Sequence, residues 1–164
     1  MKKYVTLFVI MALMGCATVP VPRLIQNAWI IDQGFDEAWT MTLETLTEMG
    51  MTPERFEKDS GLIITEAVAI RGNNKSGPCD CGKLAFTQFE SHREATFTVL
   101  VKAINENKSE IKIIGDYKVY FTDSIDAATQ SRLERMIHKQ LYVRPCVSTG
   151  KVEVEFYSKI VGQS

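Results

Sequence analysis

Two stretches in the middle of the chain alternate apolar and polar residues with a period of two, which is typical of a β-strand with one buried face. Their apolar positions are Ala95, Phe97, Val99, Val101 and Ala103 in the first stretch, and Ile111, Ile113, Tyr117, Val119 and Phe121 in the second. The residues between them, 105–108, are turn formers (Asn-Glu-Asn-Lys). The pattern predicts two long strands of one antiparallel sheet.

Three shorter apolar segments predict further strands. Residues 29–31 and 55–58 are short candidates, whereas residues 62–70 carry apolar side chains on both faces, which indicates a central strand. Asp59-Ser60-Gly61 lies between the last two segments and predicts a hairpin turn.

Apolar residues spaced by three and four predict a helix over residues 35–49. Asp36 and Glu37 place negative charge in its first turn, where the helix dipole favours it. Gly50 follows the last apolar turn and suits the left-handed position after a helix. Trp39 lies on the apolar face, so we expect it in the core.

A second helix is expected after Asp123 or Ser124, either of which can cap it, and it would run to about Tyr142, before Pro145 and Cys146. Its inner face would comprise Leu133, Met136, Ile137 and Leu141.

Residues 150–161 fit both a strand and a helix. The helix is favoured because residues 148–150 (Ser-Thr-Gly) supply start signals and acidic residues follow them. Together the elements predict an α+β fold, with an antiparallel sheet of four to five strands and two or three helices packed on one face. We expect a single domain over residues 28–164.

The N-terminus predicts an export signal. Lys2 and Lys3 precede an apolar run over residues 4–14, which suits a signal peptide better than a membrane-spanning helix. The run ends in Leu13-Met14-Gly15-Cys16, which resembles the lipobox of bacterial lipoproteins. The resemblance implies that residues 1–15 are removed and that Cys16 carries fatty acyl chains such as palmitate, which together give a stable anchor.

The residues after Cys16 indicate where such an anchor would lie. Ala17 follows the cysteine where an aspartate would favour inner-membrane retention, so in a diderm host the resemblance implies a periplasm-facing anchor in the outer membrane. Residues 16–27 contain two prolines and predict a short, extended tether.

Composition narrows the function classes. The chain has 164 residues, of which 45% are hydrophobic and 24% are charged, with a formal net charge of −1. This apolar content is sufficient for a packed core and excludes a disordered chain. The near-neutral charge argues against nucleic acid as a partner.

A second resemblance rests on two neighbouring segments. Phe35-Asp36-Glu37-Ala38-Trp39 continues through Leu43, Leu46 and Gly50, and is followed by Asp59-Ser60-Gly61-Leu62-Ile63. This arrangement is similar to small envelope lipoproteins of the BamC-like class, and it covers roughly residues 28–70. It implies a sheet-and-helix domain that acts as a protein-binding accessory of outer-membrane assembly.

Three cysteines remain if Cys16 is lipidated, namely Cys79, Cys81 and Cys146. In an oxidising compartment we expect either Cys79 or Cys81 to form a disulfide with Cys146, which leaves one thiol. A zinc site made of the three cysteines and His92 is the alternative, although only one residue separates the first pair. A redox module is a further alternative at the same cluster.

No set of residues in the sequence defines a reaction, so we expect neither enzymatic activity nor a cofactor. The leading hypothesis is a membrane-anchored scaffold that binds an envelope protein through the long polar segment 71–92. The candidate contact residues there are Asn73, Asn74, Lys75, Lys83 and Phe86.

The alternative function is a periplasmic carrier of a small ligand or lipid. It would require a cavity between sheet and helices, lined by Phe97, Tyr117, Val119 and Phe121.

Overall fold

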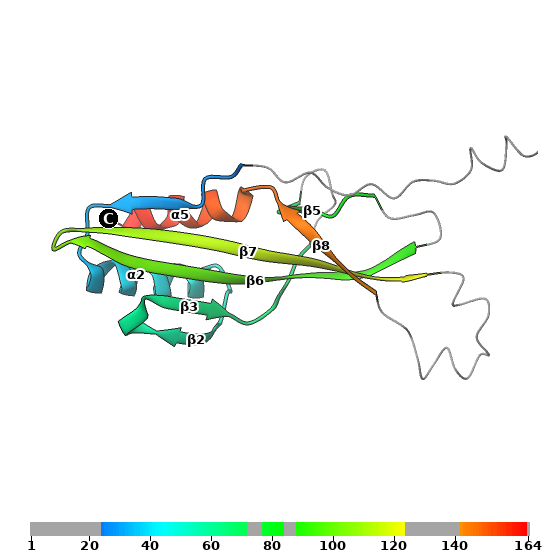
Figure 1. Cartoon of the computed structure of the whole chain (residues 1–164), viewed down its shortest axis with the longest axis horizontal. Coiled ribbons are helices and arrows are strands. Elements are labelled where there is room, and N and C mark those ends of the chain that lie inside the picture. Colours follow the sequence, from blue (N-terminus) through cyan, green and yellow to red (C-terminus); the bar gives the residue numbers. More distant parts are fainter. Residues whose placement is uncertain (1–23, 72–76, 84–87, 124–141, 164) are drawn as a thin grey trace, which may run out of the picture.

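The fold is built on a long antiparallel hairpin (Figure 1). The structure is a computed structural model and describes residues 24–71, 77–83, 88–123 and 142–163. Strands β6 (Gln88–Asn105) and β7 (Lys108–Asp123) pair along almost their whole lengths. The two long strands predicted from the alternation are therefore confirmed, and both extend beyond the alternating stretches.

The other strands attach to the two sides of this hairpin. They are β1 (Ala28–Ile31), β2 (Pro53–Glu57), β3 (Leu62–Thr65), β4 (Val68–Ala69), β5 (Cys79–Asp80) and β8 (Tyr142–Ser148). The sheet order is β2-β3-β6-β7-β8-β5, while β1 pairs with β7 and β4 pairs with β6; every pairing is antiparallel. β1 and β8 share one side of β7, where they follow each other along the strand.

One face of the hairpin forms the core. Its buried side chains are Ala95, Phe97, Val99, Val101, Ile111, Ile113, Tyr117 and Val119. Helix α2 (Phe35–Glu48) contacts β6 and β7, helix α5 (Lys151–Gln163) contacts β7, and the two helices contact each other. Both helices were predicted, and Trp39 is buried as expected. Within the described residues, no helix is long and apolar enough to cross a membrane.

The turn between β2 and β3 brings the backbone of Gly61 against β6. Gly61 has a positive φ of 67°, and the N–H of Val101 donates to its carbonyl oxygen at 2.8 Å. A β-carbon at this position would lie 1.9 Å from the Val101 carbonyl oxygen. Gly50, which follows α2, has a similar φ of 70°, but a β-carbon there would meet nothing within 4 Å.

The predicted fold class, with four to five strands and two or three helices on one face, is wrong. The sheet has eight strands, and the described residues contain two α-helices, so strand dominates. Three strands add to the five predicted: β8 has seven residues, whereas β4 and β5 have two residues each. Such segments are too short to show a period of two, and they become strands because a long neighbour offers unpaired backbone groups.

The segment predicted as one central strand, 62–70, is divided into β3 and β4, which both pair with β6. At the break, the side-chain oxygen of Thr65 accepts a hydrogen bond from the backbone N–H of Phe97 at 3.0 Å. A side chain thus replaces the backbone carbonyl that a continuous ladder would supply.

The helix expected to run to about Tyr142 does not include this residue, because Tyr142 begins β8. Pro145 lies inside this strand, opposite Lys118 of β7. Within the described part of the chain, β5 pairs with only Val147 and Ser148 of β8, so Pro145 lies at a free edge of that strand, where proline is tolerated. The inner-face residues proposed for that helix, Leu133, Met136, Ile137 and Leu141, lie outside the described residues.

The long polar segment 71–92, which we expected to be a loop, is one only in part, because β5 lies within it and β6 begins at Gln88. The signal peptide, Cys16 and the first part of the tether lie outside the described residues.

The two glycines provide a matched test of the β2–β3 turn. Gly50→Ala should lower the free energy of unfolding by about 1 kcal/mol, because alanine is disfavoured in the left-handed region. Gly61→Ala should lower it by about 3 kcal/mol or more, because the new methyl group also displaces the Val101 backbone. Chemical denaturation of both variants measures this difference, and equal losses would contradict the close approach.

Candidate functional site

Three cysteines converge at one end of the core. Cys81 and Cys146 form a disulfide, and Cys79 is a free, buried thiol. The sulfur atoms of Cys79 and Cys81 are 3.8 Å apart, and the three sulfurs lie within 4.8 Å of one another. The expected pairing of one early cysteine with Cys146 is therefore found, and Cys81 is the partner.

The cluster is positioned by β5 and β8. Cys79 lies opposite Ser148 and Asp80 lies opposite Val147, so this ladder contains only two residue pairs. Two hydrogen bonds extend it, from the Thr149 N–H to the Pro78 carbonyl and from the Thr149 hydroxyl to the Gly77 carbonyl. The disulfide is thus the strongest connection between the β5 segment and the rest of the sheet.

A buried cation lies next to the free thiol. Arg93 is only 6% exposed, and its Nη2 lies 2.6 Å from Oε2 of Glu90. Burial raises the pKa of the Cys79 thiol; the nearby Arg93 guanidinium opposes this rise, whereas the Glu90 and Asp80 carboxylates add to it. Burial outweighs the one positive charge, so the surroundings favour the neutral thiol over the thiolate.

A second buried polar group lies under the start of α5. The hydroxyl of Ser148 donates to Oε1 of Glu153 at 2.6 Å, and the N–H of Gly150 donates to the Ser148 hydroxyl oxygen at 3.0 Å. Glu153 is only 2% exposed. Burial raises the pKa of the neighbouring Tyr117, and the charge of Glu153 raises it further.

Sequence reasoning missed these two buried charges, although a signal for each was present. Arg93 precedes Ala95 by two positions and so continues the inward-facing set of β6. Glu153 precedes Phe156 and Ile160 by three and seven positions, which places it on the inward face of α5.

The predicted four-ligand zinc set is not assembled. His92 neighbours Arg93 on β6 but is exposed, and its ring stacks on Tyr120 with centroids 4.4 Å apart. Tyr120 in turn donates a hydrogen bond to Glu94. Among the described residues, the cluster with an arrangement that could hold a metal ion consists of the three cysteines, and two of them are joined in the disulfide.

The candidate contact residues Asn73, Asn74, Lys75 and Phe86 lie outside the described residues. Lys83 is exposed, and its carbonyl oxygen accepts a hydrogen bond from Nη1 of Arg144 at 3.2 Å. Arg144 also donates to Gln88 and lies over the ring of Phe121. The backbone around Lys83 is thus tied to β6 and β8.

The face of the sheet that points away from the core carries apolar side chains. Leu100 is 38% exposed and Ile114 is 42% exposed. Leu62 lies opposite Leu100, and Ile64 and Ile114 both lie opposite Thr98, so these side chains share one face. We call the four residues Leu62, Ile64, Leu100 and Ile114 the open-face patch.

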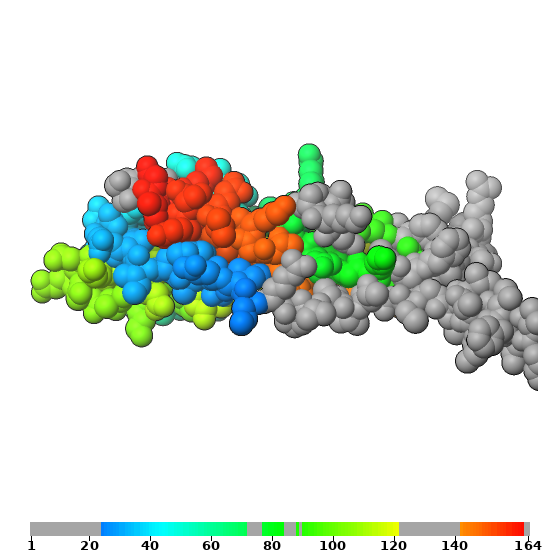
Figure 2. All heavy atoms as spheres, turned by 90° about the horizontal axis from the view of Figure 1, so that it is seen from above, coloured from blue at the N-terminus to red at the C-terminus, as the bar shows by residue number. Residues whose placement is uncertain are grey.

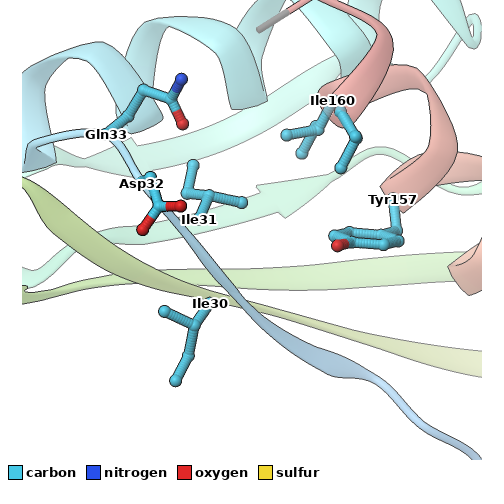
Figure 3. Close-up of a pocket in the computed structure, with 7 residues that line it drawn as sticks. Ile30, Ile31, Asp32, Gln33, Tyr157 and Ile160 are labelled. Atoms are coloured by element: carbon cyan, nitrogen blue, oxygen red, sulfur yellow. The ribbon is translucent and has the colours of Figure 1, made fainter.

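A groove lies between β1 and α5, which are neighbours on the surface (Figure 2). It has a volume of ≈ 190 Å³ and is lined by residues of both elements. Ile31 and Ile160 lie on the helix side of β1, whereas Ile30 points away from the helix (Figure 3). The volume is below the range of about 300–1,000 Å³ that drug-sized ligands need.

The residues expected to line a carrier's cavity are packed in the core instead. Phe97, Tyr117 and Val119 are each at most 1% exposed, and the rings of Phe97 and Tyr117 meet edge to face with centroids 5.7 Å apart. Phe121 is also buried. The groove between β1 and α5 includes none of these four residues.

No family model matches the chain. The chain is similar to the outer membrane protein assembly factor BamC of Thiobacillus denitrificans, with 26% identity over 114 residues. The aligned segment is 68% of this chain and 30% of that protein, so the chain spans less than a third of its curated relative. The similarity supports a BamC-like relationship for this chain.

The disulfide should make a large contribution to stability. Replacing both cysteines in Cys81→Ala/Cys146→Ala should lower the free energy of unfolding by about 4 kcal/mol, because the bond closes a loop of 65 residues in the unfolded chain. Denaturation with and without a dithiol reductant measures this loss. The reductant should destabilise the wild-type protein and leave the double variant unchanged; a wild-type protein insensitive to reductant would contradict the pairing.

The burial of Tyr117 predicts a loss of stability at high pH. Its folded-state pKa is raised, so the unfolded chain releases this proton first, from about pH 10, and stability falls as the pH rises towards the folded-state pKa. The test compares Cys79→Ala with the double variant Cys79→Ala/Tyr117→Phe. Between about pH 9 and about pH 11, the free energy of unfolding should fall by about 1 kcal/mol less in the double variant. Denaturant titrations at both pH values measure it, and equal falls would contradict the burial effect.

Proposed function

We propose that this chain is a lipid-anchored, non-enzymatic protein-binding accessory of outer-membrane protein assembly. The observation that carries the proposal is the similarity over 114 residues to a protein named as an outer membrane protein assembly factor. The lipobox ending at Cys16 supports the same location, since it predicts an anchor in the envelope. The proposal is limited to the segment that this chain shares with the relative, which is 30% of the relative's length.

The open-face patch is the surface that we assign to the partner. Leu100 and Ile114 are exposed near the middle of the two longest strands. Charged residues flank them, with Lys112 opposite Leu100 and Glu110 opposite Lys102. An apolar centre with a polar rim is the usual anatomy of a protein–protein contact.

The packed core favours contact over carriage. A carrier needs an interior volume for its cargo, whereas Phe97 and Tyr117 fill the space between the sheet and the helices. The groove beside β1, with a volume of ≈ 190 Å³, is smaller than the sites that usually hold drug-sized ligands.

The tether restricts where the partner lies. Residues 16–27 can reach at most about 40 Å when fully extended. An anchored domain therefore remains close to the membrane surface, and its partner is expected in the same membrane or directly beneath it.

Photo-crosslinking in native membranes tests this proposal. A photoreactive residue at Thr98, between the apolar side chains of the patch, should crosslink the lipidated protein to a component of the outer-membrane assembly machinery. The double variant Leu100→Asp/Ile114→Asp should reduce this crosslink at least about tenfold, because each buried apolar side chain at a contact centre contributes more than about 1 kcal/mol.

Two controls separate the patch from general effects. Val154→Asp changes an exposed apolar residue on α5, away from the open face, and should leave the crosslink unchanged. Cys16→Ala should abolish the crosslink through loss of the anchor. Capture that is unaffected by the Leu100/Ile114 variant would refute the assigned surface, and capture of lipid alone would favour a carrier.

A further inference from the structure

The free thiol of Cys79 lies in contact with an existing disulfide. Its sulfur is 3.8 Å from Sγ of Cys81, and the Cys146 sulfur completes a group within 4.8 Å. Thiol–disulfide exchange requires a thiolate that reaches one sulfur of a disulfide along the S–S axis. Cys79 is within contact distance of Cys81, and its side chain must rotate to attack in line, because the three sulfurs are clustered and not collinear.

We propose that the three cysteines form an internal thiol–disulfide exchange site in which Cys79 is the nucleophile. The Cys79 thiolate attacks Sγ of Cys81, a Cys79–Cys81 bond forms, the Cys81–Cys146 bond breaks, and Cys146 leaves as a thiolate. The proton lost by Cys79 is balanced by the one that Cys146 takes up. One disulfide and one thiol are present before and after the step, so no external oxidant or reductant is needed.

The exchange moves the free thiol towards the surface. Before the step, the thiol belongs to Cys79, which is 0% exposed. After it, the thiol belongs to Cys146, which is only partly buried in β8. A small thiol reagent or the disulfide of another molecule can then reach it, so Cys146 becomes a modification site that the starting pairing conceals.

The exchange also changes what holds β5 in place. The Cys81–Cys146 bond joins the β5 segment to β8, whereas a Cys79–Cys81 bond lies within one short segment. After exchange, the connection consists of the two-residue ladder and the hydrogen bonds of Thr149. The covalent link between the two strands is thus removable without any change in the number of disulfides.

A buried cation, Arg93, lies beside the Cys79 thiol. Its buried guanidinium lies close enough to Cys79 to favour the thiolate form, and its ion pair with Glu90 holds it there. Burial and the negatively charged neighbours Glu90 and Asp80 disfavour the thiolate and raise the pKa of the Cys79 thiol, and Arg93 partly offsets this rise.

Alkylation followed by non-reducing peptide mapping tests the proposal on the full-length lipidated protein. The folded protein is incubated with iodoacetamide for several hours, acidified and digested with trypsin. Cys79 and Cys81 fall in one peptide, residues 76–83, whereas Cys146 falls in another, residues 140–151, because Pro145 blocks cleavage after Arg144. The starting pairing therefore yields two linked peptides, whereas exchange yields two separate ones.

The expected product is a peptide 140–151 alkylated on Cys146, together with an unlinked peptide 76–83 that contains an internal disulfide. The amount of alkylated Cys146 should fall at least about tenfold in Cys79→Ser, which retains the size of the side chain but lacks the nucleophile. Cys79→Ala repeats this control without a buried hydroxyl, and near-ultraviolet circular dichroism checks that both variants are folded.

Three results would overturn the proposal. Alkylation of Cys79 within linked peptides would show that this thiol reacts outwards and does not attack its neighbour. Absence of any label until denaturant is added would show that no exchange occurs in the folded protein. Alkylation of Cys81 with a Cys79–Cys146 bond would show that Cys146 is attacked and is not the leaving group.

Discussion

The register of the β6–β7 hairpin is the constraint on which the rest of the structure depends. Side chains alternate between the two faces of a strand, so a slip of one residue would turn every buried side chain of the hairpin towards solvent. Phe97, Val99, Ile111 and Ile113 hold the register because all four are fully buried or nearly so on one face. β1, β3, β4 and β8 all pair with one of these two strands, so they inherit their positions from it.

The same register explains why charged groups lie in the core. Beyond Ala95, the next inward position of β6 is Arg93, and the corresponding end of β7 presents Tyr117. These polar side chains lie where the β5 segment and β8 cover the hairpin, and the cysteine cluster lies there as well. A buried cation without a nearby carboxylate is expensive, and Glu90 supplies that carboxylate at 2.6 Å. One end of the core is therefore apolar, and the other is polar and rich in sulfur.

The sequence pattern within a short segment predicts those elements whose formation depends on that segment alone. The two long strands, helix α2 with Gly50 after it, and the C-terminal helix follow from periodicity and end signals within about fifteen residues. β8 could not be predicted in this way, since Pro145 argues against a strand until the pairing with β7 and the free edge are known. β5 is a strand only because β8 lies beside it, and β8 follows it by more than sixty residues in the sequence.

In the candidate site, too, one part follows from the sequence and another part only from the fold. Spacing and compartment predicted a disulfide to Cys146, but only the packing of β5 against β8 selects Cys81 over Cys79. In the unfolded chain the entropy of loop closure by itself favours the Cys79–Cys81 bond, because one residue separates these cysteines whereas the Cys81–Cys146 bond closes a loop of 65 residues. The exchange proposed for the cluster also runs in the opposite direction, with Cys146 attacking a Cys79–Cys81 bond. A third cysteine next to the pair thus provides a path from the pairing that the unfolded chain favours to the pairing that the folded sheet favours. The same path, taken backwards, unlocks β5 from β8 in the finished protein, so one arrangement of sulfur atoms serves both the formation and the release of the link.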